Sequence, residues 1–236
     1  MICDIIEQLK SELKNGVKLM AVSKTRTLDE VRAAFECGQT LFGENHVQEL
    51  VAKFDPQTNP LASSLRCEMI GHLQRNKVRQ AVRLASRIDS VDSLQLALKI
   101  DNEAALQGKV MPVLIEVNTS GEDSKSGFLD LAKAEDAIGR ISLLNNIEIE
   151  GFLTVGPVLC TVGTAQWEKK THESFAMLRE FQNRMLKSFP ESKMNELSMG
   201  MTHDWRIAVE EGSTMVRIGT LIFGERAYAE SEGCRK

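Results

Sequence analysis

Apolar runs typical of buried β-strands alternate with helical patterns along the whole chain, and this alternation restricts the fold more than any other feature. Strands that alternate with helices pair in parallel and place the helices outside the sheet. Eight such runs are present, and with an opening helix at residues 1–14 set aside they leave roughly 28 residues per unit, close to the ~30 of one strand–helix repeat. The expected strands are Lys18–Ser23, Thr40–Phe42, Arg66–Gly71, Arg87–Val91, Val110–Asn118, Ile149–Val155, Glu196–Met199 and Thr214–Ile218.

Alternation by itself admits an open, doubly wound sheet as well as a closed barrel. Two observations favour the barrel. The 236 residues match the ~250 of a typical eight-stranded barrel, and no linker rich in Pro, Gly or Ser divides the chain, although Pro56–Ser64 reads as a longer irregular connection. We therefore predict an α/β protein, a single (β/α)8 TIM barrel domain over residues 1–236 with an extra N-terminal helix. The other expected helices include Leu28–Cys37, Leu94–Leu106, Leu129–Leu144, Trp167–Leu186 and Asp204–Glu211.

The charge and hydropathy of the chain argue against two classes of partner. A net charge of −4 and a pI near 5.7 disfavour binding to nucleic acid or to anionic membrane surfaces. No apolar run approaches the roughly 20 residues of a membrane span, and the N-terminus carries acids where a secretory signal needs basic residues. We therefore expect a cytoplasmic protein.

Cysteine and histidine positions argue against disulfides and metal sites. The five cysteines are odd in number and widely scattered, so free thiols are expected at Cys3, Cys37, Cys67, Cys160 and Cys234. The four histidines show no metal-binding spacing, so no metal site is expected at His46, His72, His172 or His203.

Lys24 is the sharpest candidate for chemistry. Barrels of this kind build their active site at the C-terminal ends of the strands, and Lys24 follows the apolar run Leu19–Val22. A lysine amine held among apolar walls can lose its proton and condense with a carbonyl compound. Taken alone, a lysine that reaches from a strand end into solvent is the commoner explanation.

Glycine and hydroxyl residues stand where each of the last two strands gives way to a helix. Glycine lets a phosphate approach the backbone, and barrels commonly bind phosphate in their last loops. The candidates are Ser198, Gly200, Gly219 and Thr220. Ordinary tight turns and helix caps would use the same residue types.

Arg217 lies inside the apolar run Met215–Ile218, where a buried arginine without a polar partner would be costly. In a pyridoxal phosphate site, a charged partner to the ring nitrogen tunes the cofactor, and an arginine discourages protonation of that nitrogen. A buried ion pair with Glu116 or Glu150 is the structural alternative.

Six ordered blocks of the sequence resemble the pyridoxal phosphate homeostasis protein family, also called the proline synthase co-transcribed family, over nearly the full length. They are Leu19–Thr25, Phe42–Glu49, Ile70–Lys77, Ser124–Gly127, Leu197–Met201 and Gly212–Thr220, the last followed by Phe223 and Gly224. Because this family is similar to the N-terminal barrel of alanine racemase, the resemblance implies a fold type III barrel with pyridoxal 5'-phosphate held as a Schiff base on Lys24. The other cofactor contacts that it implies are Asn45 and His72 near the ring, Ser198, Gly200, Gly219 and Thr220 around the phosphate, and Arg217 at the ring nitrogen.

The resemblance also implies a function in vitamin B6 homeostasis, in which the protein buffers pyridoxal phosphate and delivers it to apo-enzymes without established turnover. The alternative is a weak amino-acid racemase, which needs a second base beside Lys24, for which His72 or His46 would serve. The sole tyrosine, Tyr228, follows the last strand. A third alternative, a metal-dependent or phosphosugar barrel enzyme, lacks the histidine spacing that a metal needs. The missing racemase C-terminal domain favours a monomer.

Some positions depart from the usual family pattern. His46 stands where a tyrosine is usual, and Thr202 and His203 stand where a serine and an acidic or polar residue often follow. Lys125 could be a second amine that receives the aldehyde, or an ordinary solvated lysine. The segment Val158–Ala165, with Cys160, carries no assignment.

Overall fold

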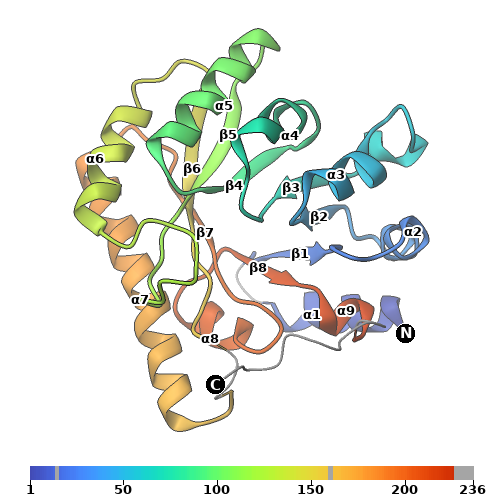
Figure 1. Cartoon of the computed structure of the whole chain (residues 1–236). Coiled ribbons are helices and arrows are strands. Elements are labelled where there is room, and N and C mark those ends of the chain that lie inside the picture. Colours follow the sequence, from blue (N-terminus) through green and yellow to red (C-terminus); the bar gives the residue numbers. More distant parts are fainter. Residues whose placement is uncertain (14–15, 159–161, 226–236) are drawn as a thin grey trace.

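Eight parallel strands close into a barrel, because each strand pairs with the next and β8 pairs with β1 (Figure 1). The structure, a computed structural model, describes residues 1–13, 16–158 and 162–225. The predicted α/β barrel is confirmed, and all eight expected strands are present. They are β1 (Lys18–Val22), β2 (Leu41–Glu44), β3 (Arg66–Met69), β4 (Arg87–Val91), β5 (Met111–Glu116), β6 (Ile147–Leu153), β7 (Glu196–Ser198) and β8 (Met215–Ile218).

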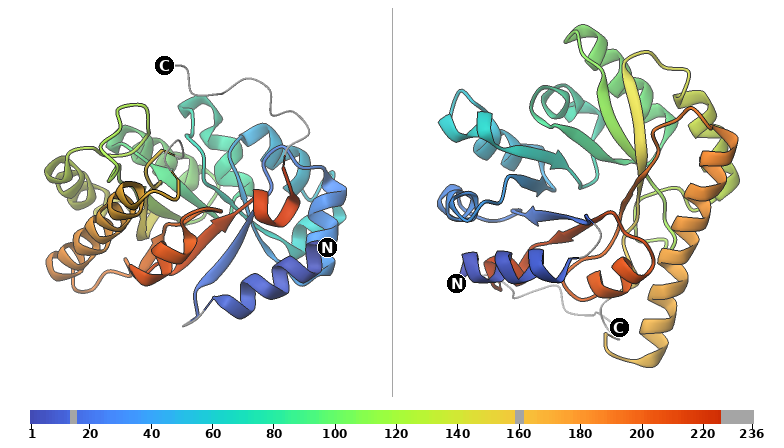
Figure 2. Two further views of the ribbon diagram at one scale, coloured as in Figure 1. Left: turned by 90° about the horizontal axis from the view of Figure 1, so that it is seen from below. Right: turned by 180° about the vertical axis from the view of Figure 1, so that it is seen from behind.

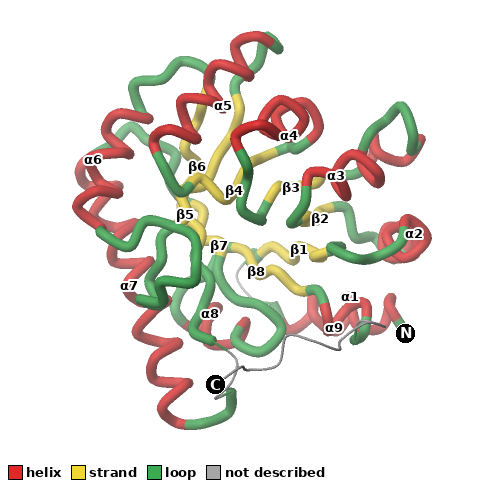
Figure 3. Tube along the Cα trace, in the orientation of Figure 1, coloured by secondary structure: helices red, strands yellow, loops and turns green. Residues whose placement is uncertain are grey.

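Helices cover the outside of the barrel, as the two further views and the tube drawing show (Figures 2 and 3). Local signals start several of them: Thr27 and Glu30 form a capping box at α2, and the Asp130 carboxylate accepts from two backbone amides at the start of α6. The helices are α1 (Ile2–Glu12), α2 (Leu28–Glu36), α3 (Val47–Phe54), α4 (Val78–Leu84), α5 (Leu94–Leu106), α6 (Leu131–Ile141), α7 (Ala165–Ser188), α8 (Trp205–Glu210) and α9 (Thr220–Phe223).

The sequence patterns did not specify the short helices α3, α4 and α9. The irregular connection expected at Pro56–Ser64 contains a 3-10 helix, Pro60–Ser64, whose first turn is capped by the side chain of Asn59. None of the helices within the described residues combines the length and the hydropathy that a membrane span requires.

The apolar core has two parts, one on each side of the barrel wall. Between the strands and the surrounding helices lie large buried side chains such as Phe42, Ile88 and Phe152. Inside the barrel lies a smaller group, formed by Met20, Leu114, Leu153 and Met215. Since side chains alternate across a strand, the residue two positions after an inner side chain also faces the barrel interior. This alternation carries Val22, Glu116 and Arg217 toward the C-terminal mouth.

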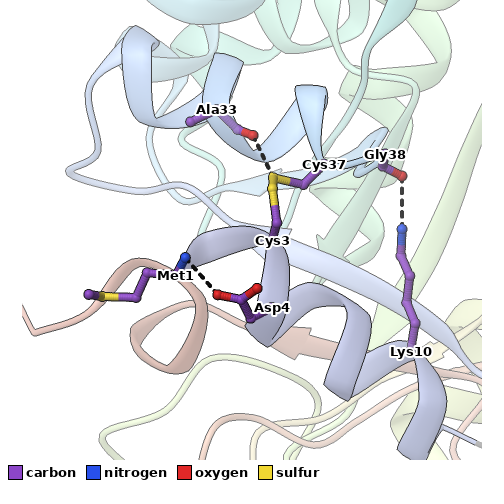
Figure 4. The surroundings of a disulfide bond; sticks show 7 residues. All are labelled: Met1, Cys3, Asp4, Lys10, Ala33, Cys37 and Gly38. Carbon is purple, nitrogen blue, oxygen red and sulfur yellow. Dashed lines mark hydrogen bonds and ion pairs between the residues drawn. A yellow bond between two sulfur atoms is a disulfide. The ribbon is translucent and has the colours of Figure 1, made fainter.

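A disulfide joins Cys3 of α1 to Cys37 at the end of α2 (Figure 4). The expectation of free thiols is therefore wrong for these two cysteines. They are 34 positions apart in sequence, but α1 packs against α2 and brings their Cα atoms to 5.0 Å. The Lys10 ammonium reinforces this link by donating to the Gly38 carbonyl at 2.8 Å. Cys67 is a buried free thiol, while Cys160 and Cys234 lie outside the described residues, as does Tyr228.

Candidate functional site

A cavity of about 430 Å³ opens at the C-terminal mouth of the barrel. This volume falls within the usual range of small-molecule sites. Residues from the ends of six of the eight strands line it, so distant parts of the sequence meet there. The lining residues are Val22, Lys24, Asn45, Ile70, Leu153, Val155, Met201, Thr202, His203, Asp204, Arg217, Gly219 and Thr220.

Lys24 lines this cavity from a position just beyond β1. Val22 lines it as well, whereas Ser23 between them turns away and donates its hydroxyl to Glu44 Oε1 at 2.7 Å. The two-residue period of the strand thus continues past its end and directs the lysine inward. Lys24 is half-buried. The sequence prediction that Lys24 lies at the mouth agrees with this placement.

Arg217 is the buried cation of the site, and only 4% of its surface is exposed. Its Nη1 donates to Ser198 Oγ and its Nη2 to the Thr154 carbonyl, both at 2.7 Å. Among the described residues it forms no ion pair. Burial lowers the pKa of the guanidinium, and the more distant charges of Asp89, Asp204 and Glu116 oppose that shift. The cation is therefore held by neutral oxygens.

The alternative that placed Arg217 in an ion pair with Glu116 or Glu150 is not observed. Glu150 pairs with Arg87 instead, at 3.1 Å. Glu116 is buried two residues after the inner side chain Leu114, and its Oε2 has no hydrogen-bond partner among the described residues. Burial and repulsion from Asp92 raise the pKa of Glu116 to about 7.

The four phosphate candidates occupy different places. Gly219 and Thr220 line the cavity, but Ser198 is fully buried and binds Arg217. Gly200 has a φ of +97°, and a Cβ on it would lie 2.6 Å from the Ala208 Cβ, so this glycine allows α8 to pack against the end of β7.

The two ring candidates are also separated. Asn45 lines the main cavity, whereas His72 lines a different hollow of about 370 Å³ together with Arg75. There, His72 Nδ1 lies 3.0 Å from the Asp92 carboxylate.

Four consecutive lining residues, Met201–Asp204, were not among the predicted site residues, although Thr202 and His203 had been noted as departures from the family pattern. Asp204 is buried, and its carboxylate accepts a hydrogen bond from the Met201 amide, which closes the loop between β7 and α8. Burial raises the pKa of Asp204. The sequence signal that could have identified Met201–Asp204 as lining residues was their position directly after a strand end, beyond Gly200.

Two other regions raised by the sequence lie apart from this cavity. Lys125 donates to the Gly156 carbonyl at 2.6 Å and pairs with Glu122 at 3.1 Å, so its ammonium is bound within neighbouring loops. Residues 159–161 of the segment Val158–Ala165, Cys160 included, lie outside the described residues.

A larger hollow, about 560 Å³, lies at the opposite end of the barrel. Its charged lining is already paired, since Lys18 binds Glu196 at 2.5 Å and Lys193 binds Glu148 at 2.8 Å. The smaller cavity at the C-terminal mouth combines an amine, a buried guanidinium without an ion pair, and hydroxyl groups. It is the better candidate for a ligand that carries an aldehyde, a ring nitrogen and a phosphate.

Comparison with known proteins gives consistent results along nearly the whole chain. The family model described as "Alanine racemase, N-terminal domain" matches residues 4–227. The chain is 36% identical over 224 residues to the pyridoxal phosphate homeostasis protein of Vibrio alginolyticus, covering 94% of this chain and 92% of that protein. The human protein of the same name is 35% identical, with 90% of this chain and 78% of that protein covered.

Solved structures show the same similarity. PipY of Synechococcus elongatus is 34% identical and matches over 95% of this chain and 100% of PipY. The TM-score is 0.87 for PipY without pyridoxal phosphate and 0.84 for PipY with pyridoxal phosphate bound.

Proposed function

Since this chain belongs to the pyridoxal phosphate homeostasis protein family, we propose that it binds pyridoxal phosphate in the cavity at the barrel mouth, as a Schiff base on Lys24. One observation carries the proposal: Lys24, from the first strand, and Arg217, from the last, line one cavity because β1 and β8 pair to close the barrel. Amine and guanidinium thus lie in reach of the same small molecule.

The residues present fit the chemistry of this cofactor. When bound, pyridoxal phosphate supplies an aldehyde that condenses with amines and a ring that withdraws electrons from the resulting adduct. The Lys24 amine would hold the aldehyde, and Arg217 would donate to the ring nitrogen. Thr220 and Thr202 offer hydroxyls, and Gly219 an accessible backbone, for the phosphate. Asn45 would contact the ring substituents.

Ser198 takes a different part in this proposal from the one that the resemblance implied. Its hydroxyl accepts from Arg217, so it would orient the guanidinium instead of touching phosphate. Thr154, whose carbonyl is the second acceptor, is itself fixed by a chain of buried hydroxyls: its Oγ1 lies 2.9 Å from Thr119 Oγ1, which lies 2.7 Å from Ser174 Oγ on α7.

The biological function that we propose is storage of the reactive aldehyde and its delivery to apo-enzymes. An arginine at the ring nitrogen would keep the ring unprotonated and so a weaker electron sink, which suits storage of the aldehyde. The two histidines considered as second bases also do not join Lys24: neither His46 nor His72 is among the lining residues of the cavity.

The test is an absorption spectrum of the protein with added pyridoxal phosphate, followed by borohydride reduction and peptide mass spectrometry. We expect a visible band, and a reduced adduct on Lys24, that are lost in Lys24→Ala. Lys125→Ala is the matched control, because Lys125 is a second partly buried lysine near the mouth that does not line the cavity. A band that persists in Lys24→Ala would refute the proposed site. Conversion of L-alanine to D-alanine that depends on Lys24 would favour the racemase instead.

A further inference from the structure

The backbone turns sharply directly after Lys24. Thr25 has a φ of +63°, and it is the one non-glycine residue with positive φ among those the structure describes. A β-branched residue rarely adopts this conformation, and it persists only where the surroundings hold it. Something outside the segment must therefore stabilise the turn that follows the lysine.

A cluster of charged residues behind the barrel wall holds this turn. Glu49 of α3 accepts the Thr25 amide at 2.6 Å, and Lys53, one helical turn later, donates to Glu49 at 2.7 Å. Lys53 also donates to the Ser23 carbonyl at 2.7 Å and to Glu44 Oε1 at 2.8 Å. The residues on both sides of Lys24 are thus fixed by one network.

Most of the network is buried on the side away from the cavity, although 24% of the Glu49 side chain is exposed. Glu44 is fully buried and Lys53 is 6% exposed. Glu44 Oε2 has no hydrogen-bond partner among the residues that the structure describes, and burial raises the pKa of this carboxyl against the opposing charge of Lys53. Buried ion pairs are a poor source of stability, because desolvation offsets most of their attraction. Their value here lies in the geometry that they impose on residues 23–25.

We infer that Glu49, together with Lys53 and Glu44, is a positioning group for Lys24: it holds the strained turn that directs the lysine amine into the cavity. The inference rests on the proposed function, because it concerns the amine that would receive the aldehyde. The three residues touch no ligand themselves and act through the backbone of Ser23 and Thr25.

A change in this positioning group should affect the condensation of the Lys24 amine with the aldehyde. It should not affect the binding of the ring and the phosphate. Asn45, Arg217, Gly219 and Thr220 line the cavity from other strands, and none of them bonds to Glu49 or Lys53. Pyridoxine 5'-phosphate, which has an alcohol in place of the aldehyde, reports on that recognition alone. Pyridoxal 5'-phosphate reports on recognition and condensation together.

The experiment measures dissociation constants for both compounds and the borohydride-trapped fraction on Lys24, in wild type, Glu49→Ala and Glu49→Gln. Removal of a charge-assisted hydrogen bond corresponds to about a tenfold change. We expect Glu49→Ala to weaken the binding of pyridoxal phosphate about tenfold and the binding of pyridoxine phosphate less than about twofold. Glu49→Gln keeps an acceptor for the Thr25 amide, so it should restore most of the affinity.

Glu103→Ala is the matched control. Glu103 is also a helical glutamate paired with a lysine four residues away, Lys99, at 2.8 Å, but it lies on α5. The Glu103→Ala variant should change neither of the two dissociation constants.

Three results would overturn the inference. They are equal weakening of the binding of both compounds in Glu49→Ala, no change in either dissociation constant in that variant, or the same loss of pyridoxal phosphate affinity in Glu103→Ala. Failure of the proposed function looks different, because it appears already in the wild type as an adduct that is absent or attached to another lysine. That result would overturn both.

Discussion

Two arginines point into the barrel, and their surroundings are opposite. Arg87, at the N-terminal end, contacts four carboxylates: Asp89 at 2.7 Å, Glu68 at 2.8 Å, Glu150 at 3.1 Å and Glu196 at 3.5 Å. Arg217, at the C-terminal mouth, contacts one hydroxyl and one carbonyl. Both are nearly inaccessible to solvent.

The pKa shifts of the two groups follow from these contacts. Burial opposes the charge of both arginines, but Asp89 and Glu68 outweigh it at Arg87 and raise its pKa, whereas burial prevails at Arg217 and lowers it. Arg87 is saturated with counter-charges and its donors are occupied. Arg217 contacts no carboxylate within the described part of the chain, so its charge remains for a ligand to neutralise.

This contrast separates a structural end of the barrel from a functional one. In TIM barrels the N-terminal face serves stability and the C-terminal face carries the site. Here the same residue type, buried to the same degree, falls into either class according to its partners.

The largest effect is expected for Arg87→Met. Removal of the cation leaves Glu68, Asp89, Glu150 and Glu196 without their common partner, and the breaking of a buried ion pair costs about 3–5 kcal/mol. Chemical denaturation monitored by circular dichroism measures this loss. A loss below about 1 kcal/mol would mean that the cluster is not the stabilising element of the N-terminal end.

Reduction of the Cys3–Cys37 disulfide should come next. The bond closes a loop across 34 positions, and disulfides of this kind typically contribute about 2–4 kcal/mol. It lies on the outside of the barrel, so the affinity for pyridoxal phosphate should stay within about twofold. Reductant should lower the stability of wild type but not that of Cys3→Ser. An equal response of both proteins to reductant would contradict the assignment.

The pH dependence distinguishes the two ends of the barrel through one carboxyl at each. Burial and repulsion from Asp89 raise the pKa of Glu68 to about 8, while Glu116, near Arg217, titrates at about 7. Both values lie above the ordinary 4.5, so the unfolded chain loses these protons first as pH rises. The contribution of each protonated carboxyl to the stability of the folded state is therefore complete below about pH 4.5. It is lost as the pH rises to about 8 for Glu68 and to about 7 for Glu116.

Urea denaturation between pH 5 and 8.5 measures this loss, which should approach about 1.4 kcal/mol per pH unit for each carboxyl between its unfolded and folded pKa. Glu68→Gln should remove the part that extends to pH 8, and Glu116→Gln the part that ends near pH 7. A pH profile unchanged in both variants would show that other groups are responsible.

The smallest effect on stability is expected for Arg217→Met. The variant loses two hydrogen bonds but also removes an unpaired buried charge, so we expect a change of about 1 kcal/mol or less. The affinity for pyridoxal phosphate should fall about tenfold, because the proposed donor to the ring nitrogen is gone. Arg217→Lys, which keeps the charge but not the planar fork, should recover little of this affinity. A stability loss as large as that of Arg87→Met would remove the distinction between the two arginines.

The order of the strands and helices, the closed barrel and the position of Lys24 were all accessible from the sequence. They depend on local period: two-residue alternation identifies strands, and a polar residue directly after an apolar run marks a strand end. Short helices such as α3 and α4 were less accessible, because few residues carry their pattern and packing against the barrel determines them.

The partners of buried groups were decided only by the tertiary structure. The sequence predicted that Arg217 needs a polar neighbour, yet not that Ser198 would be that neighbour or that Glu150 would bind Arg87. It gave no sign that Cys3 would meet Cys37, or that Glu49 would hold the turn after Lys24. These contacts join elements far apart in the chain, and they depend on distances and directions that exist only once the barrel has closed.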